Sequence, residues 1–232
     1  MTDQTPDPDF IKSFRRKVIR WGKKNTRSFP WRYQDNPYRI LVSEFMLHRT
    51  QARQVEPVYN DFISRYPTLT SFCSSNKEEI AETLKSLGLT WRILGMITAL
   101  NEILISFGDV PISYEKLITI SGIGQYIAGA TVCFSQNTAI PLVDTNTVRI
   151  VGRVLGLSLR GEARRRKVMV QAIGTLSDPT KPRDFYYAMI DIAHGICKPH
   201  DPNCKECPLF SLPCDYAFFE KQEEVKAKQK AK

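Results

Sequence analysis

The sequence has no apolar run close to the roughly 20 residues that a membrane-spanning helix requires. Its opening residues, MTDQTPDPDF, are polar and acidic, unlike a signal or transit peptide. Sustained two-residue alternation of apolar and polar side chains is also missing, so we expect few strands. These absences exclude a membrane span and an export signal from the expected features of the chain.

What the chain does contain is an ordinary supply of core residues and an excess of positive charge. Hydrophobic residues make up 42% of its 232 residues, which supports a folded core and excludes wholesale disorder. Lysine and arginine total 33 against 24 aspartates and glutamates, a net charge of +9. This excess favours a polyanionic partner, with nucleic acid as the first candidate. We therefore expect a cytoplasmic, nucleoid-associated protein.

Basic side chains are concentrated in two runs that are candidate phosphate contacts. Most charge runs are solvated faces, so we expect only some of these residues to touch a nucleic acid. The two runs are the N-terminal residues Arg15, Arg16, Lys17, Arg20, Lys23, Lys24 and Arg27, and the segment RRRK at 164–167.

Apolar residues recur at helical spacing along almost the whole chain. Two further helices are expected within 114–134, around a tight turn. The pattern predicts an all-α fold with helices at about 10–24, 39–49, 56–65, from 76, 92–107, 144–157, 164–176 and 184–196.

Four of the six cysteines lie within 18 residues, in the pattern C-x6-C-x2-C-x6-C. They are Cys197, Cys204, Cys207 and Cys214. A cytosolic chain does not keep such a set as disulfides. Four thiolates could hold one zinc ion or one [4Fe-4S] cluster, and spacing leaves both open. The proline-rich loop that carries them needs a ligand centre to fix its shape.

The segment ISGIG at 120–124 predicts a tight turn between two short helices. Gly122 and Gly124 allow successive backbone N–H groups to be exposed. Together with the N-terminus of the following helix, these donors form an anion site that suits a phosphate. Small residues at 128–130 let the second helix pack closely on the first. The turn is therefore a candidate contact to a DNA backbone.

Three motifs occur together in one order: ISGIGQYIAGA, LVDTNTVRIVGR and the cysteine loop. In this combination the chain resembles the helix-hairpin-helix DNA glycosylases of the endonuclease III superfamily over about residues 28–216. The last cysteine gap is six residues, where the family usually has five. The resemblance implies a two-lobed fold with a six-helix barrel lobe at 28–138, a hairpin at 114–134, an iron-sulfur lobe formed by 1–27 plus 139–217, and a basic tail at 218–232.

The activity that the resemblance implies is cleavage of the glycosidic bond of a base flipped out of double-stranded DNA. The partner would be DNA with a mismatched or damaged base, bound by a monomer, and the four cysteines would hold a [4Fe-4S] cluster. Asp144 matches the catalytic aspartate, which stabilises positive charge on the sugar as the bond breaks. Asp144 is also expected to cap a helix.

Two further residues bear on the reaction type. Tyr126 occupies the position of the lysine with which bifunctional relatives form a Schiff base, and a phenol cannot form an imine. The resemblance therefore implies a monofunctional enzyme without lysine-based lyase activity. Glu44 matches a glutamate that protonates the leaving base or positions water in the adenine and thymine-mismatch enzymes.

Other residues match positions that contact DNA in the family. His48-Arg49 replaces the two glutamines of adenine glycosylases, and GLTWR at 88–92 replaces their GLGYY-like loop. Arg49 is expected to fill the gap left by the base or to read the orphan guanine, with Trp91 or Arg92 as a second wedge. The full set of expected DNA contacts is Gly122, Gly124, Gln125, His48, Arg49, Trp91, Arg92, Lys198 and Lys205.

The substrate that these residues favour is thymine or uracil opposite guanine. The alternative within the class is adenine opposite guanine or 8-oxoguanine. Full adenine glycosylases append a domain for 8-oxoguanine, and only 18 residues follow Cys214 here, which weakens that alternative. Outside the class, the chain could be a non-catalytic DNA-binding module with a four-cysteine metal site, such as a zinc-bearing transcription factor. The presence of both Glu44 and Asp144 favours the enzyme.

Overall fold

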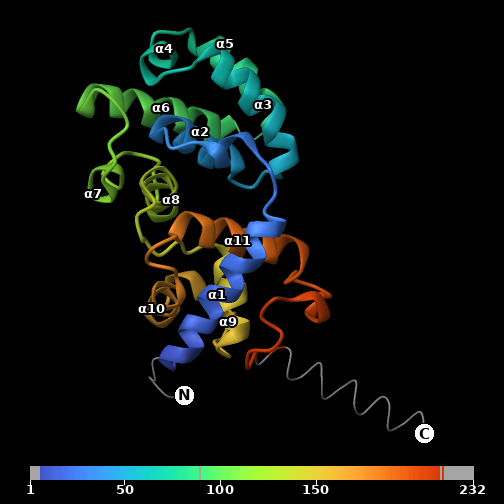
Figure 1. Ribbon diagram of the computed structural model, residues 1–232. Helices are drawn as coiled ribbons and strands as arrows, with labels where there is room; N and C mark the ends of the chain where they lie inside the picture. The colour runs from blue at the N-terminus through green and yellow to red at the C-terminus, as the bar shows by residue number, and fades with distance from the viewer. Residues whose placement is uncertain (1–5, 89, 215, 217–232) are drawn as a thin grey trace, which may run out of the picture. The chain divides into compact units, whose positions relative to one another are not determined.

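The computed structural model describes residues 6–88, 90–214 and 216, and these residues form helices and no strand (Figure 1). The predicted all-α fold is therefore confirmed. The chain divides into two compact units, Ser28–Ile140 and the combination of Met1–Arg27 with Pro141–Lys232. The predicted basic tail at 218–232 lies outside the described residues. Among the described helices, none is long and apolar enough to cross a membrane.

The unit Ser28–Ile140 is arranged around α2, which packs against α8, α3 and α6. Every residue of α2 from Tyr38 to Met46 is buried except the partly buried Arg39, because other helices cover it on nearly all sides. A six-helix barrel stays a prediction for this unit. Its elements are η1 Pro30–Tyr33, α2 Pro37–Leu47, α3 Ala52–Arg65, α4 Leu69–Cys73, α5 Lys77–Leu84, η2 Lys85–Leu87, α6 Thr90–Phe107, α7 Tyr114–Leu117 and α8 Gln125–Gln136.

Two helices in this unit have bounds that differ from the sequence-based ranges. The helix expected at 39–49 begins at Pro37, capped by Asn36, and ends at Leu47, because Arg49 has the left-handed φ of 62° that no α-helix contains. The helix expected at 56–65 begins at Ala52, with Pro57 inside it. Pro57 has no N–H, so the helix lacks the hydrogen bond that residue 57 would donate to the carbonyl of Arg53.

In the other unit α11 is the central helix, with α1 and α9 packed against it and α10 packed against α1 and α9 (Figure 1). A Cβ atom on Gly22 of α1 would lie 2.7 Å from the Cβ of Ala188 on α11, so only glycine allows this approach. The iron-sulfur lobe stays a prediction. The elements of this unit are α1 Pro8–Asn25, α9 Thr145–Val154, η3 Ala163–Arg165, α10 Lys167–Leu176, α11 Pro182–Gly195 and η4 Cys204–Glu206.

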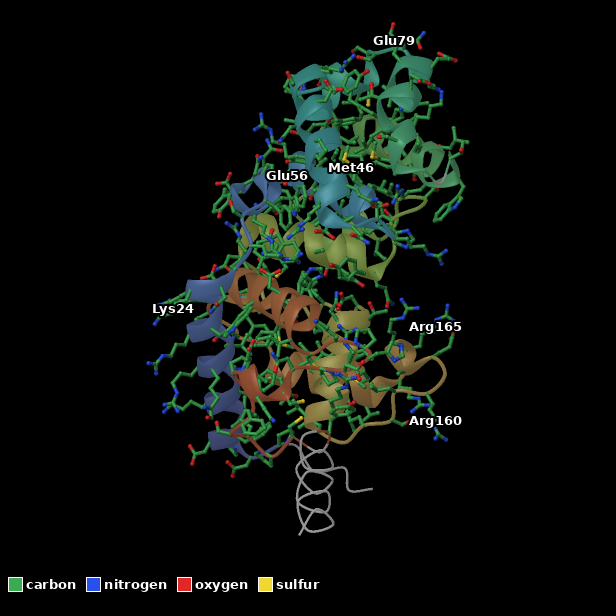
Figure 2. The ribbon with its side chains drawn as sticks, turned by 90° about the vertical axis from the view of Figure 1, so that its right-hand side faces the viewer. Lys24, Met46, Glu56, Glu79, Arg160 and Arg165 are labelled. Carbon is green, nitrogen blue, oxygen red and sulfur yellow. The ribbon has the colours of Figure 1, made fainter. Side chains whose placement is uncertain are left out.

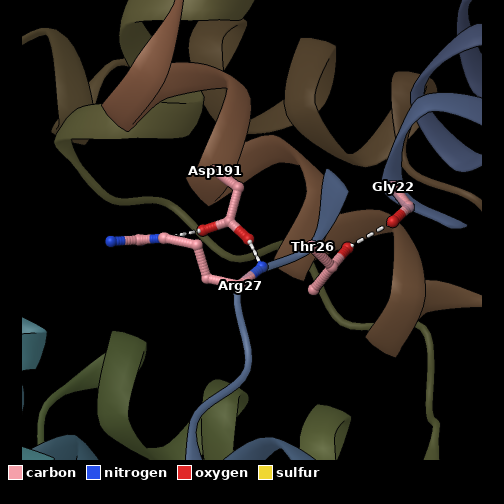
Figure 3. Close-up of polar contacts among 4 residues, drawn as sticks. All are labelled: Gly22, Thr26, Arg27 and Asp191. Atoms are coloured by element: carbon pink, nitrogen blue, oxygen red, sulfur yellow. Dashed lines mark hydrogen bonds and ion pairs between the residues drawn. The ribbon is translucent and has the colours of Figure 1, made fainter. Parts of the chain in front are cut away.

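An ion pair fixes the end of α1 on α11 (Figure 3). The buried carboxylate of Asp191 accepts hydrogen bonds from the backbone N–H of Arg27 at 2.8 Å and from its Nε at 2.6 Å. The Thr26 hydroxyl donates to the carbonyl of Gly22 at 2.7 Å. A buried carboxylate is stabilised only when it is paired in this way. The Arg27 side chain therefore stabilises the packing of the end of α1 against α11.

Arg15, in the middle of α1, is likewise bonded within the unit. Its Nη2 donates to the carbonyl of Thr175 at 2.8 Å and its Nε to that of Leu176 at 3.4 Å. Both acceptors belong to α10. Of the N-terminal basic run, Arg15 and Arg27 hold helices together instead of offering their guanidinium groups to a phosphate.

Candidate functional site

The predicted turn at 120–124 is present between α7 and α8. The N–H of Ile123 donates to the carbonyl of Ile120 at 3.1 Å, and both isoleucines are buried. Gly122 has a φ of +82°, which favours glycine, and Gly124 is the N-cap of α8. Gly122, Gly124 and Gln125 are exposed. Buried isoleucines thus hold a turn whose glycines face solvent, as a backbone anion site requires.

One donor of this turn already has a partner. The backbone N–H of Ser121 donates to Oε2 of Glu102 on α6 at 3.1 Å. This bond ties the turn to α6, and it places a negative charge beside the turn. The anion site that the sequence predicts is therefore shared with a carboxylate of the chain itself.

Asp144 is the N-cap of α9, as predicted. Its Oδ1 accepts from the backbone N–H groups of Asn146 and Thr147 at 3.0 and 2.7 Å, and its Oδ2 accepts from Nδ2 of Asn146 at 2.7 Å. The N–H of Asp144 donates to the Thr147 hydroxyl oxygen at 3.0 Å, which completes a capping box. The side chain is partly buried. Its carboxylate is thus held in one orientation.

A chain of hydrogen bonds connects this carboxylate with the cysteine loop. Arg149 Nη2 donates to Oδ1 of Asn146 at 3.2 Å and to the carbonyl of Ala193 at 3.0 Å. Its Nε donates to the carbonyl of Cys197 at 2.7 Å. Burial lowers the pKa of the Arg149 guanidinium. Asp144, Asn146, Arg149 and Cys197 thus form one connected network.

Arg153, one turn further along α9, reaches the same loop. Its Nη1 lies 3.2 Å from Sγ of Cys197 and donates to the carbonyl of Lys198 at 2.7 Å. Its Nη2 donates to the carbonyl of Pro199 at 2.9 Å. We did not predict roles for Arg149 and Arg153 from the sequence. The two arginines are four residues apart, which places both on one face of the helix that Asp144 caps, and this signal could have revealed them.

The four predicted metal-ligating cysteines line one small cavity of about 30 Å³. Burial raises the pKa of the Cys207 thiol to about 11, and the thiols of Cys197 and Cys214 shift it in the same direction. Within the described part of the chain, no three Cys, His, Asp or Glu side chains gather closely enough to hold one metal ion. The four thiols thus line a common space, and the [4Fe-4S] cluster stays a prediction.

In the other unit, Glu44 lies on α2 with only 6% of its surface exposed. His48 and Arg49 follow the helix and are exposed. Trp91 is 56% exposed, and its ring meets that of His48 edge-on at a centroid distance of 5.8 Å. Exposed aromatic and basic side chains thus lie side by side within this unit, as a DNA contact requires.

The structure corrects the prediction that Arg92 contacts DNA. Arg92 is only 4% exposed. Its Nη1 donates to the carbonyls of Met46 and His48 and, at 2.8 Å, to Oγ1 of Thr50. Its Nη2 donates to the carbonyl of Leu87 at 3.0 Å. The guanidinium is used inside the fold, where burial lowers its pKa, and it holds the loop 48–50 in place.

Three other predicted site residues are exposed or partly buried. Tyr126 is partly buried in the first turn of α8. Lys198 and Lys205 are exposed on the cysteine loop. The roles of these three residues stay predictions.

The comparisons with known proteins agree with this arrangement. Residues 42–171 match the family of HhH-GPD superfamily base excision DNA repair proteins. The chain is 34% identical to the thymine-DNA glycosylase of Aeropyrum pernix, over 90% of this chain and 96% of that one. It is 31% identical to the adenine DNA glycosylase of Mycolicibacterium smegmatis, over 83% of this chain and 66% of that one.

Among solved structures, that of a thermostable thymine-DNA glycosylase matches with a TM-score of 0.82 and 28% identity, over 90% of this chain and 97% of that one. The hairpin turn and the capped Asp144 both lie inside the matched segment, residues 42–171. A match over more than half of the chain, together with relatives above 30% identity, assigns the family. The chain belongs to the HhH-GPD superfamily of base excision DNA repair proteins.

Proposed function

We propose that this protein is a monofunctional DNA glycosylase that releases thymine or uracil opposite guanine. The oriented carboxylate of Asp144 is the single structural observation that carries the glycosylase part. The substrate part is supported by similarity to the Aeropyrum pernix thymine-DNA glycosylase over nearly the full length of both chains.

Asp144 supplies the negative charge for the reaction. As the glycosidic bond breaks, positive charge develops on the sugar, and a carboxylate held beforehand in one orientation stabilises it without reorganisation. The two backbone N–H groups of Asn146 and Thr147 provide that hold through Oδ1. Oδ2 accepts from Asn146 and retains lone-pair capacity for a water or the sugar.

Glu44 acts on the base. A carboxyl group shielded from water is suited to protonate a leaving base or to position the attacking water. Glu44 is buried on α2 among apolar neighbours, including Leu41 and Phe45. The proposed role needs the side chain to reach the flipped base through a pocket that opens when DNA binds.

Tyr126 makes the enzyme monofunctional. It lies in the first turn of α8, where the bifunctional relatives carry their lysine. A phenol at this position contacts the base or sugar without forming an imine. Water is therefore the nucleophile, and the product is an abasic site in an intact strand.

A [4Fe-4S] cluster held by Cys197, Cys204, Cys207 and Cys214 completes the proposal. Their common cavity and the hydrogen bonds of Arg153 to the loop support this assignment. Such a cluster fixes the shape of the proline-rich loop and, through it, the positions of Lys198 and Lys205 for DNA phosphates. Anaerobically prepared protein should contain four iron and four sulfide per chain. One zinc with no iron would contradict the assignment.

The substrate is tested by base release from G·T, G·U, A·G and A·8-oxoguanine duplexes at one salt concentration, under single-turnover conditions. We expect thymine and uracil to leave faster than adenine, in part because a mismatched thymine costs less to unstack. The similarity to the Mycolicibacterium smegmatis adenine DNA glycosylase supports adenine release as the second candidate. Faster release of adenine would make that candidate the function.

A further inference from the structure

One side of α1, within the N-terminal basic run of the sequence, forms an open hollow of about 360 Å³. Arg16, Lys17, Arg20 and Lys24 line it, and we call these four residues the α1 basic face. The half-buried Trp21 and the exposed Asn25 lie among them, and Pro208 from the cysteine loop forms a wall. The hollow thus combines four cations with an aromatic ring.

The α1 basic face carries positive charge that the described part of the fold does not balance. None of the lining residues is acidic, and none of the four cations takes part in a described ion pair. Arg16 and Arg20, and then Arg20 and Lys24, are like-charge pairs at i,i+4, which destabilise a helix. Arg15 on the same helix and Arg27, just after its end, instead bond inside the unit. An anionic ligand would offset this repulsion.

The spacing of the cations suits the backbone of a nucleic acid. From Arg16 to Lys24 the helix rises by about 12 Å, at about 1.5 Å per residue. A DNA strand carries one phosphate per about 3.4 Å of axis, so the row is long enough for about three phosphates. The indole of Trp21 adds an apolar surface for a sugar. Pro208 joins the face to the cysteine loop, which carries the exposed Lys205.

We infer that the α1 basic face is an additional DNA-binding surface, which binds the phosphate backbone of a duplex whether or not a mismatch is present. The face is separate from every residue proposed for base release, so the inference does not depend on which base leaves. Figure 2 shows Lys24 on the α1 side of its unit, with Arg160 and Arg165 on the opposite side of the same unit. Arg160 lies outside both basic runs of the sequence and supplies one control position.

The test is the salt dependence of affinity for two duplexes that differ only by one G·T mismatch. Affinity falls with salt by a log–log slope of about 0.9 per phosphate contact. The variant R16Q/R20Q/K24Q should therefore lower the slope by about 2 to 3, equally for both duplexes. The control K77Q/R160Q/K181Q removes the same charge from exposed positions outside both basic runs and should lower the slope by less than about 1.

Base release separates this inference from the proposed function. With enzyme in saturating excess, the R16Q/R20Q/K24Q variant should release thymine at the wild-type rate, because affinity alone has changed. An unchanged slope, or the same decrease in both variants, would overturn the inference. Failure of the wild type to release any base would contradict the proposed function, while the slope comparison would still decide the role of the α1 basic face.

Discussion

Each unit holds an arginine that bonds to a candidate site loop, Arg92 buried and Arg149 partly buried, and the two arginines differ in what they connect. Arg92 binds backbone carbonyls and one hydroxyl of neighbouring loops, so it organises the loop 48–50. Arg149 instead bridges the side chain of Asn146 and the carbonyl of Cys197. Burial lowers the pKa of both guanidinium groups. Arg92 thus holds one loop in place, and Arg149 connects the capping network of Asp144 with the cysteine loop.

The comparison shows that a basic residue in a sequence motif can bond within the fold, so its presence alone does not establish a DNA contact. A guanidinium has five donors in a fixed plane, so it can satisfy several carbonyls that helix ends and loops leave unpaired. Arg92 is used in this way, whereas Arg49, three residues after Met46, is exposed. Substitutions of Asp144, Arg92 and Arg149 should therefore separate effects on base release from effects on stability.

The largest effect should follow Asp144→Asn, which changes the carboxylate of the network that contains Arg149. Asparagine caps a helix about as well as aspartate, so α9 and its network should persist. The transition state loses a charge, and base release should fall by about 100-fold or more, while affinity for the mismatched duplex stays within a few-fold. Single-turnover kinetics and duplex titration measure the two quantities. A wild-type rate would show that Asp144 only caps the helix.

Arg92→Met should have the next largest effect, on stability. The change leaves buried carbonyls at Met46 and Leu87 without donors, and each such loss costs about 1 to 3 kcal/mol. We expect the free energy of unfolding to fall by about 3 kcal/mol in urea denaturation. Arg49→Met makes the same chemical change at an exposed neighbouring position and should cost less than about 0.5 kcal/mol. Equal decreases in the free energy of unfolding for Arg92→Met and Arg49→Met would show that Arg92 has no special role in stability.

The parts of the site that sequence predicts well are those fixed by near neighbours. Asp144 caps α9 because Thr147 stands three residues later and completes a capping box. Gly122 adopts a positive φ because the turn between two short helices demands it. The all-α fold follows from helical periodicity in the same local way.

The parts that sequence does not predict depend on distant partners. Arg92 reads as a surface residue until Met46, 46 residues away, supplies its acceptor. Arg15 and Arg27 stand in one basic run with Arg16 and Arg20, and only contacts with Thr175 and Asp191 tell them apart. Such pairings are set by tertiary packing, which overrides local pattern.

A smaller effect is expected for Arg149→Gln, which breaks the bridge between Asn146 and the cysteine loop and leaves Asp144 and the four cysteines in place. Glutamine is too short to reach Asn146 and Cys197 together, so the orientation of Asp144 should loosen and base release should slow by about 10-fold. Iron content should stay at the wild-type level. Arg153→Gln is the matched change, and because Arg153 contacts Cys197 Sγ, it should lower iron content. An unchanged rate of base release in Arg149→Gln would mean that Arg149 positions the cysteine loop and does not orient Asp144.

The smallest signal should come from borohydride trapping. This experiment tests whether the enzyme, with Tyr126 after the hairpin turn, forms an imine with DNA. The wild type should give almost no covalent adduct with a G·U duplex, and strands should break only after alkali or heat, because no amine occupies the first turn of α8 at this position. Tyr126→Lys should create a weak adduct, since a lysine there is partly shielded as the tyrosine is. Adding Asp144→Asn should abolish that adduct, because imine formation needs the base to leave first. Efficient trapping by the wild type would show that another amine attacks the sugar, and the enzyme would then be bifunctional despite its tyrosine.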